Sequence, residues 1–266
     1  MADTARGFGI AAGLEPEVAR AVGKRCAEHG YRSLWSNDHP LASGLATIAE
    51  FAAVAPGLDV GVAVLPLDRH EPPAIAATVE ELGLEPARLW LGIGAGFTKR
   101  PLGVVREGIA AVRSVLPGAR VVVAAMGPKM CALAGAEADG VFFNWMTPDF
   151  AETARAQVAE GARDAGRSSS PPIFGYVRVA VGDDAGERLA KEESFYRQLH
   201  QGYIRHFEAL GRPEGTVGIA ATDPATVADE LRPYDDVLDH VVVRALAHAD
   251  TESLGRVADA AAPARR

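Results

Sequence analysis

The chain has 266 residues, of which 48% are hydrophobic and 23% are charged, the balance of an ordinary soluble globular protein. Its net charge of -8 excludes the broad basic field that holds DNA, RNA or an anionic membrane surface. No apolar run approaches the ~20 residues of a membrane span, and the first residues lack a signal-peptide core, so we expect a cytoplasmic protein.

Eight short β-rich runs alternate with longer helical patterns along the chain. The runs are nearly continuous in apolar residues, which is typical of parallel strands that are covered on both faces. The predicted strands are residues 7–11, 32–36, 58–65, 88–94, 120–125, 140–144, 173–181 and 238–243.

The segments between these runs carry ordinary helix signals. After the first strand, Pro16 suits a first helical turn, and Val18, Val22 and Cys26 recur every four residues before Gly30, which can take a left-handed C-terminal position. Cys26 and Cys131 both lie in helical patterns, as expected of reduced core thiols.

Two later helices are predicted from the same signals. Residues 147–166 open with Thr147 as N-cap and Pro148 at the first helical position, and they close at Gly166. Residues 187–211 predict one long helix that ends at Gly211. Its apolar face consists of Leu189, Tyr196, Leu199, Tyr203, Phe207 and Leu210.

Eight strands, each followed by a helix or loop, predict an α/β protein of one domain over residues 1–266, a closed (β/α)8 TIM barrel. A doubly wound open sheet is the alternative. In a barrel the functional residues lie at the C-terminal ends of the strands. The residues that follow each strand are therefore the candidates for a site.

Asp38 and His39 follow the second predicted strand, in the stretch SLWSNDHP. A histidine at the functional rim, beside a carboxylate, can move a proton or orient a substrate. Two structural interpretations stay open: His39 satisfies a backbone group, or Asp38 caps the next helix. No metal site is expected, because HExxH is absent and His200 and His206 are six residues apart.

Two glycine turns follow the fourth and fifth strands. In GIGAG, at residues 92–96, glycines let a ligand approach the main chain closely, but the spacing is not that of a dinucleotide site. Gly127 and Pro128 open a helix whose free N–H groups form an anion site, and Lys129 adds positive charge there. A plain turn is the alternative. Four cations either form a basic rim or are scattered: Lys99, Arg100, Lys129 and Arg178.

Several strand exits together resemble the bacterial-luciferase-like superfamily, in its branch that uses the deazaflavin coenzyme F420. The matching segments are GYRSLWSNDHP, VGVAVLPLDRHEP, RLWLGIGAG and VVVAAMGPKMCALAGAEADGVFFNWMTP, which lie in order in about the first 150 residues. GYVRVAVG extends the match to the seventh strand, and the stretch after residue 183 matches only in general character.

This resemblance implies a luciferase-like (β/α)8 barrel and assigns roles to several residues. A bulge with a non-proline cis peptide at Ala63-Val64 would back the deazaflavin ring, Asp38 would contact the cofactor, and His39 would be catalytic. Asn144 would help to orient the ring, or is a polar residue that closes the core. The backbone that would hold the phosphate-bearing tail is that of Gly94, Ala95 and Gly96 and of Gly127, Pro128, Lys129 and Met130.

The chain departs from the family pattern at three places. Only FTKRPLG separates the glycine turn after the fourth strand from the next helix, where many relatives carry a long excursion. Pro40, Leu41 and Ala42 stand where some relatives have a tryptophan. The acidic residue on the fourth helix of certain deazaflavin dehydrogenases has only a loose counterpart here, Glu107. No known substrate is therefore carried over.

The resemblance implies an F420-dependent oxidoreductase that transfers a hydride between the C5 atom of F420 (8-hydroxy-5-deazaflavin) and a small organic substrate, in a homodimer. An FMN-dependent luciferase-like monooxygenase is the alternative. A non-catalytic, flavin-binding barrel is a further one, which the short connection after the fourth strand motivates.

Overall fold

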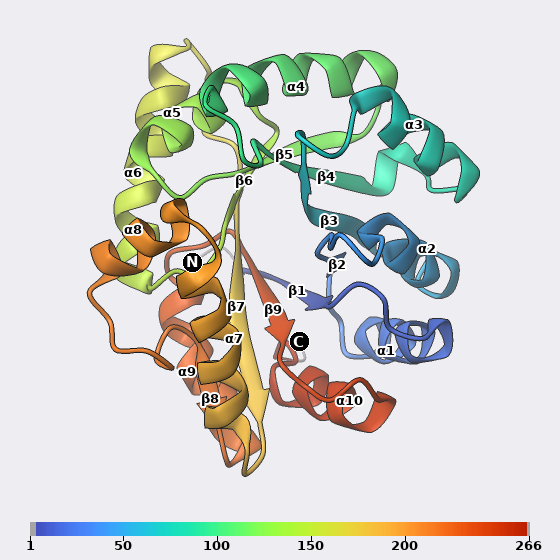
Figure 1. Ribbon diagram of the computed structural model, residues 1–266. Coiled ribbons are helices and arrows are strands. Elements are labelled where there is room, and N and C mark those ends of the chain that lie inside the picture. Colours follow the sequence, from blue (N-terminus) through green and yellow to red (C-terminus); the bar gives the residue numbers. More distant parts are fainter. Residues whose placement is uncertain (1–3, 265–266) are drawn as a thin grey trace.

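The computed structural model describes residues 4–264, and within them the strands form a closed (β/α)8 TIM barrel (Figure 1). Eight parallel strands pair in the order β1-β2-β3-β4-β5-β6-β7-β9, and β9 pairs back with β1. Their bounds are β1 Ala5–Ile10, β2 Ser33–Ser36, β3 Asp59–Pro66, β4 Leu89–Gly94, β5 Arg120–Ala124, β6 Gly140–Phe143, β7 Ile173–Val181 and β9 His240–Ala245.

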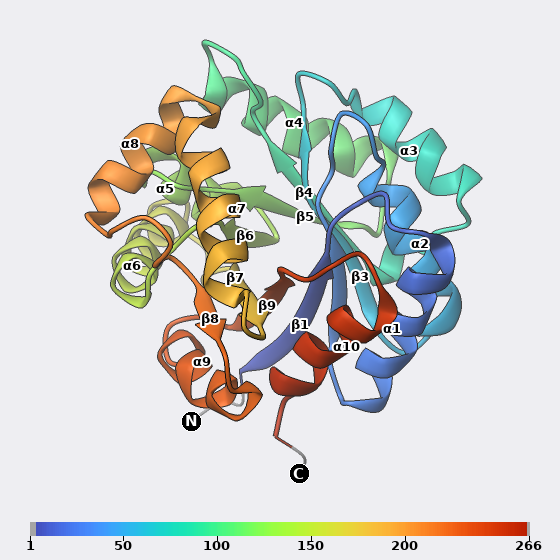
Figure 2. The same ribbon diagram turned by 60° about the horizontal axis from the view of Figure 1, so that its bottom comes forward.

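Helices surround the barrel on its outer side (Figure 2). Their bounds are α1 Pro16–Glu28, α2 Gly44–Val54, α3 Pro72–Glu81, α4 Pro101–Val115, α5 Pro128–Glu137, α6 Pro148–Asp164, α7 Ala185–Leu199, α8 Gln201–Leu210, α9 Val227–Asp235 and α10 Thr251–Ala260, with two short 3-10 turns at Pro86–Arg88 and Pro224–Thr226. Both N-terminal signals are confirmed: Pro16 begins α1, and the Thr147 hydroxyl accepts a hydrogen bond from the N–H of Phe150 at the start of α6.

The barrel prediction is confirmed, and the open-sheet alternative is wrong. An open sheet would leave two edges, whereas the β6–β7 and β1–β9 pairings close this one. All eight predicted strands are present. The last was predicted two residues too early, because β9 runs on through Arg244 and Ala245.

The stretch after β7 differs from the prediction. The single helix expected over residues 187–211 is two helices, because His200 has extended backbone, with φ -166 and ψ 165, between α7 and α8. Its Nδ1 accepts a hydrogen bond from the N–H of Gly202, which caps α8. A short strand that was not predicted, β8 (Ile219–Ala221), then pairs with the end of β7, outside the barrel.

The barrel interior is a packed core. Trp35, Phe142 and Tyr176 meet inside it, with ring centroids 5.0 Å apart for Trp35 and Phe142 and 4.6 Å apart for Phe142 and Tyr176. Small residues make room for these rings, since a Cβ on Gly61 would lie 2.4 Å from the Trp35 indole. Ligands are therefore expected at the mouth of the barrel, above this core.

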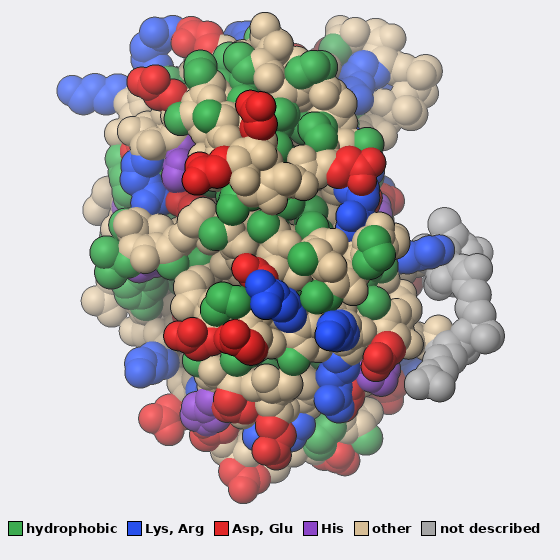
Figure 3. Space-filling model, turned by 90° about the vertical axis from the view of Figure 1, so that its right-hand side faces the viewer, with side chains coloured by type: hydrophobic (Ala, Val, Ile, Leu, Met, Phe, Trp, Pro, Cys, Tyr) green, Lys and Arg blue, Asp and Glu red, His purple; other side chains and the backbone are tan. Residues whose placement is uncertain are grey.

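The outer surface carries charge of both signs. Figure 3 shows one side of the helical layer, on which acidic and basic side chains are interspersed. Cys26 and Cys131 are buried and free of disulfides. Among the residues that the structure describes, no helix is both long and apolar enough to cross a membrane.

Candidate functional site

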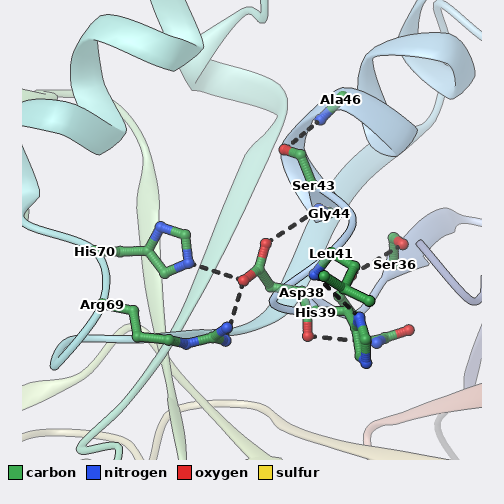
Figure 4. Close-up of polar contacts among 10 residues, drawn as sticks. Ser36, Asp38, His39, Leu41, Ser43, Gly44, Ala46, Arg69 and His70 are labelled. Carbon is green, nitrogen blue, oxygen red and sulfur yellow. Dashed lines mark hydrogen bonds and ion pairs between the residues drawn. The ribbon is translucent and has the colours of Figure 1, made fainter. Parts of the chain in front are cut away.

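The Asp38 carboxylate is held at the C-terminal end of the barrel by three donors from two neighbouring connections (Figure 4). One oxygen accepts from the N–H of Gly44, the first residue of α2, at 3.2 Å. The other lies 2.8 Å from Nε2 of His70 and 3.2 Å from the Arg69 guanidinium, both in the loop after β3. The Asp38 side chain is only 4% exposed, so this network fixes it. Asp38 therefore does help to cap the next helix, and it also joins the β2 and β3 exits.

His39 is exposed at the rim, and its ring points away from the Asp38 carboxylate (Figure 4). Its Nδ1 accepts from the N–H of Leu41 at 3.2 Å, inside a tight turn closed by two backbone hydrogen bonds between His39 and Ala42. A neutral imidazole whose Nδ1 accepts carries its proton on Nε2. His39 can therefore present a donor to a molecule at the rim.

The third strand bulges where the resemblance expects it. The β3–β4 register shifts between Val62 and Leu65, and the Ala63-Val64 peptide bond is cis. Glycine on β4 lets this bulge approach closely, because a Cβ on Gly92 would lie 2.3 Å from the carbonyl oxygen of Val62. Ala63 belongs to the cluster that fills the barrel, and Val64 packs against that cluster. Both residues thus face the top of the barrel core.

The first glycine turn, Gly94 to Gly96, holds a carboxylate of the chain itself. Asp68 accepts a hydrogen bond from the N–H of Phe97 at 2.8 Å, and a Cβ on Gly96 would lie 1.9 Å from its carboxylate. Ala95 is half-buried beside it. An anion can bind to this turn only if the Asp68 carboxylate moves away from the Phe97 N–H.

The second turn, at the start of α5, is open. Gly127 is the N-cap, no side chain caps the helix, and a Cβ on Gly127 would meet nothing within 4 Å. Pro128 and Lys129 are exposed, and Met130 is half-buried against the core. Pro128 has no N–H, and the N–H of Met130 donates to the carbonyl of Gly127 at 3.0 Å. The N–H groups of Gly127 and Lys129 can therefore donate to an anion here without steric hindrance.

Asn144 lies in a polar chain between the barrel and the helices above it. Its amide nitrogen donates to the Tyr203 hydroxyl of α8 at 2.8 Å, and its amide oxygen accepts from the Arg178 guanidinium of β7. Arg178 is 2% exposed and lies 3.7 Å above the Trp145 ring centroid. Burial lowers the pKa of this guanidinium below its ordinary value. Both polar ends of Asn144 are thus occupied.

The four predicted cations do not form one rim. Arg178 is buried, whereas Arg100 is exposed and pairs at 3.2 Å with Glu107, which is exposed as well. Lys99 and Lys129 are also exposed. In the part of the chain that the structure describes, no group of three or more His, Cys, Asp or Glu side chains is arranged to hold a metal ion.

Four residues of the mouth were not predicted: Asp68, Arg69, His70 and Arg244. His70 and Asp68 lie in the loop PLDRHEP, where only a contact across the barrel rim sets them apart from ordinary polar loop residues. Arg244 lies on β9, beyond the predicted end of the last strand, and donates to the Asn37 side chain at 3.3 Å. The sequence signal that could have identified Arg244 is a charged residue directly after the apolar run of a strand.

Known proteins of the same architecture are similar to this chain. A 5,10-methylenetetrahydromethanopterin reductase of Methanolobus tindarius is 26% identical over 242 residues, which cover 77% of this chain and 72% of the relative. A structure of an F420-dependent secondary alcohol dehydrogenase with an F420-acetone adduct superposes with a TM-score of 0.77 at 17% identity, over 98% of both chains.

Flavin enzymes with the same fold are also similar. The FMN complex of the oxygenating constituent of 3,6-diketocamphane monooxygenase from Pseudomonas putida has a TM-score of 0.68 at 14% identity, over 98% of both chains. A family model described as luciferase-like monooxygenase matches residues 106–260, more than half of the chain. The resemblance predicted from the strand exits is thereby confirmed: the chain belongs to the luciferase-like monooxygenase family.

Proposed function

We propose that this protein is an F420-dependent oxidoreductase that transfers a hydride between the C5 atom of the deazaflavin and a small organic substrate. The observation that carries the proposal is the buried Asp38 carboxylate, fixed by Gly44, Arg69 and His70 at the position that the resemblance assigns to cofactor contact. The similarity to an F420-dependent alcohol dehydrogenase supports the choice of cofactor.

The residues present fit such a cofactor in two places. The N–H groups of Gly127 and Lys129, with the Lys129 ammonium beside them, suit an anionic tail. The β3 bulge at Ala63 and Val64 offers an apolar backing for a ring at the top of the barrel core. The turn at Gly94 to Gly96 fits less well, because the Asp68 carboxylate takes its Phe97 amide.

When bound, F420 supplies a ring carbon that carries a hydride much as nicotinamide does. The chain's task is to hold the reacting groups in contact, exclude water and handle the proton that accompanies the hydride. His39 is suited to transfer that proton. Its Nδ1 accepts from Leu41, so in the neutral ring Nε2 is the donor, and it faces away from the local turn. His70, with Nε2 directed at Asp38, is suited instead to hold that carboxylate in place.

The proposal is tested by titrating the purified full-length protein with F420 and with FMN and following fluorescence. We expect low-micromolar or tighter binding of F420 and weaker binding of FMN. Equal or reversed affinities would favour the FMN-dependent monooxygenase, which the FMN complex of the similar camphane monooxygenase makes the second candidate. Turnover of bound reduced cofactor by any acceptor would set aside the non-catalytic barrel.

A further inference from the structure

Two arginines lie side by side at the mouth of the barrel. Arg178 on β7 and Arg244 on β9 are direct register partners on neighbouring parallel strands. They follow Tyr176 and Val242, which belong to the cluster that fills the barrel, so alternation directs both arginines toward the same interior. They are 2% and 8% exposed. Two like charges are thus buried side by side, which is unfavourable without a compensating anion.

The chain does not supply that anion. Arg178 bonds to the Asn144 amide oxygen, and Arg244 bonds to the carbonyl of Ala245 and the side chain of Asn37, so every partner is neutral. Within residues 4–264, neither guanidinium forms an ion pair with Asp or Glu, and Glu192 attracts Arg178 only at longer range.

The opposite end of the same barrel provides a contrast. Arg120 also lies over an indole, 4.2 Å from the Trp90 ring centroid, but it pairs with Asp59 at 2.9 Å. Proximity to an aromatic ring therefore does not by itself replace a carboxylate partner in this barrel. Of these two stacked arginines, only the one at the mouth lacks a carboxylate partner.

Around Arg178 the structure also leaves buried donors without partners. Arg178 Nε, the Tyr176 hydroxyl and Trp145 Nε1 form no hydrogen bond among the described residues. They lie in one cluster, because the Arg178 guanidinium carbon is 3.7 Å from the Trp145 ring centroid and 6.0 Å from that of Tyr176. Trp145 has a φ of 49, in the left-handed region that bulky residues avoid, and such backbone concentrates at functional sites.

We propose that Arg178 and Arg244, with Tyr176 and Trp145, bind the carboxylate group of the substrate. A guanidinium edge matches a planar carboxylate, which would accept from the donors that lack partners and neutralise the paired arginines. The rings of Trp145, Tyr176, Tyr196 and Tyr203 suit an acid with an apolar or aromatic body. The proposal rests on the proposed function in that it names the substrate class of the same barrel mouth.

Entry to this cluster depends on the helices that cover it. The Tyr203 hydroxyl of α8 accepts from Asn144, whose amide oxygen accepts from Arg178. The Tyr196 ring centroid of α7 lies 5.3 Å from the Arg178 guanidinium carbon. Because Arg178, Trp145 and Tyr176 are all buried, a ligand reaches them only when covering side chains move. Binding should therefore change the environment of Trp145 and with it the tryptophan fluorescence.

The test uses benzoate as the probe and uncharged benzamide as its neutral counterpart, titrated into full-length protein without cofactor and followed by fluorescence and calorimetry. We expect benzoate to bind and benzamide to bind at least tenfold more weakly, roughly the discrimination of one charge-assisted hydrogen bond. Arg178→Gln and Arg244→Gln should each weaken benzoate binding by about tenfold or more, and Arg178→Lys by less. Arg120→Gln, the variant of the paired arginine, should leave it unchanged. Circular dichroism and melting temperature confirm that each variant is folded.

Absence of benzoate binding, equal binding of benzamide, or equal loss in Arg120→Gln would each overturn the proposal. Preferential binding of inorganic phosphate would overturn the assignment to a carboxylate. F420 is titrated separately into the same variants. If the Arg178 and Arg244 variants lose F420 binding but keep benzoate binding, the cluster belongs to the cofactor site, and this result also contradicts the proposal. Failure of the wild-type protein to bind F420, with benzoate bound, would instead contradict only the proposed function.

Discussion

The carboxylate of Asp38 lies 2.8 Å from Nε2 of His70, a residue 32 positions further along the chain, and not against the ring of the adjacent His39. The two histidines near Asp38 therefore have different surroundings. His70 directs its Nε2 to a buried carboxylate, whereas the Nδ1 of His39 accepts from Leu41 and leaves Nε2 available at the rim. This arrangement separates a residue suited to hold the site from one suited to act on a substrate.

Asp38→Ala should weaken F420 binding before it affects anything else at the site. The substitution removes the carboxylate that would contact the cofactor, and one hydrogen bond to a charged group is worth about 1.5–3 kcal/mol. We expect a loss of affinity of about tenfold or more, measured by fluorescence titration. Asp223→Ala, which removes an exposed carboxylate at the Pro224 turn, is the control. Unchanged F420 affinity in Asp38→Ala would contradict the cofactor contact.

His39→Ala should lower turnover by about 10²–10⁴, the usual scale for a lost general acid or base, with cofactor affinity nearly unchanged. The side chain is exposed, so the melting temperature should stay close to that of the wild-type protein. His248→Ala, at another exposed histidine, should change neither quantity. A folded, cofactor-loaded His39→Ala protein with wild-type turnover would end the catalytic assignment. Lost stability with normal turnover would instead support a purely structural role.

Gly127→Asp should abolish most of the anion affinity at the start of α5 without destabilising the helix. Gly127 is already in extended N-cap geometry with open space around it, and Asp is a preferred N-cap residue, so stability should change by only a few tenths of a kcal/mol. The new carboxylate would repel the cofactor tail. Gly127→Asn is the matched control, because it has the same shape and caps the helix without charge. Equal F420 affinity in the two variants would show that the tail does not use this turn.

Asp68→Asn tests whether the first glycine turn is held back by its own carboxylate. Asn can still accept the hydrogen bond from the N–H of Phe97, so the loop should keep its conformation. Removing one negative charge beside Gly96 should tighten F420 binding by roughly two- to tenfold, since a charge pair near a protein surface contributes on the order of 1 kcal/mol. The gain should shrink as salt is raised. An affinity that falls would mean that Asp68 belongs to the binding site. A gain that does not depend on salt would show that charge repulsion by Asp68 is not its cause.

The order and type of the strands could be predicted because each strand is buried on both faces and therefore reads as a nearly continuous apolar run. The same reasoning placed the candidate residues at one end of the barrel, because all eight strands are parallel. It did not reveal the break at His200, which depends on a side-chain cap to Gly202 and on packing against Phe97, with ring centroids 5.2 Å apart. The helix propensity of residues 187–211 does not indicate the contact of His200 with Phe97, which lies far away in the sequence.

The partners within the site could not be predicted for a related reason. His70 contacts Asp38 only because β2 and β3 are neighbours in the barrel, and Arg244 lies beside Arg178 only because β9 pairs with β7. A chain-order analysis indicates which residues share an edge of the sheet. It does not indicate which side chains turn inward and touch, since that depends on register and on a strand end that was placed two residues too early.

The free energy of unfolding should fall as the pH drops below about 6.5, partly through His206. This side chain is buried between α8 and the barrel, its Nε2 lies 2.5 Å from the carbonyl oxygen of Trp145, and burial lowers its pKa below the ordinary value. A histidine whose pKa is lowered in the folded state stays neutral there while the unfolded chain takes up a proton. Its contribution to stability is therefore complete above the unfolded pKa of about 6.5 and is lost as the pH falls toward the folded value.

Each such histidine contributes a slope of up to about 1.4 kcal/mol per pH unit in that window, and burial lowers the pKa of His240 as well. His206→Gln should make the free energy of unfolding less dependent on pH between pH 6.5 and the folded pKa, by the contribution of one histidine. His248→Gln, at an exposed position, should leave the pH dependence unchanged. Denaturant unfolding followed at several pH values measures both. Parallel curves for the wild-type protein and His206→Gln would show that His206 is not held neutral, and that the contact between α8 and Trp145 tolerates the charged ring.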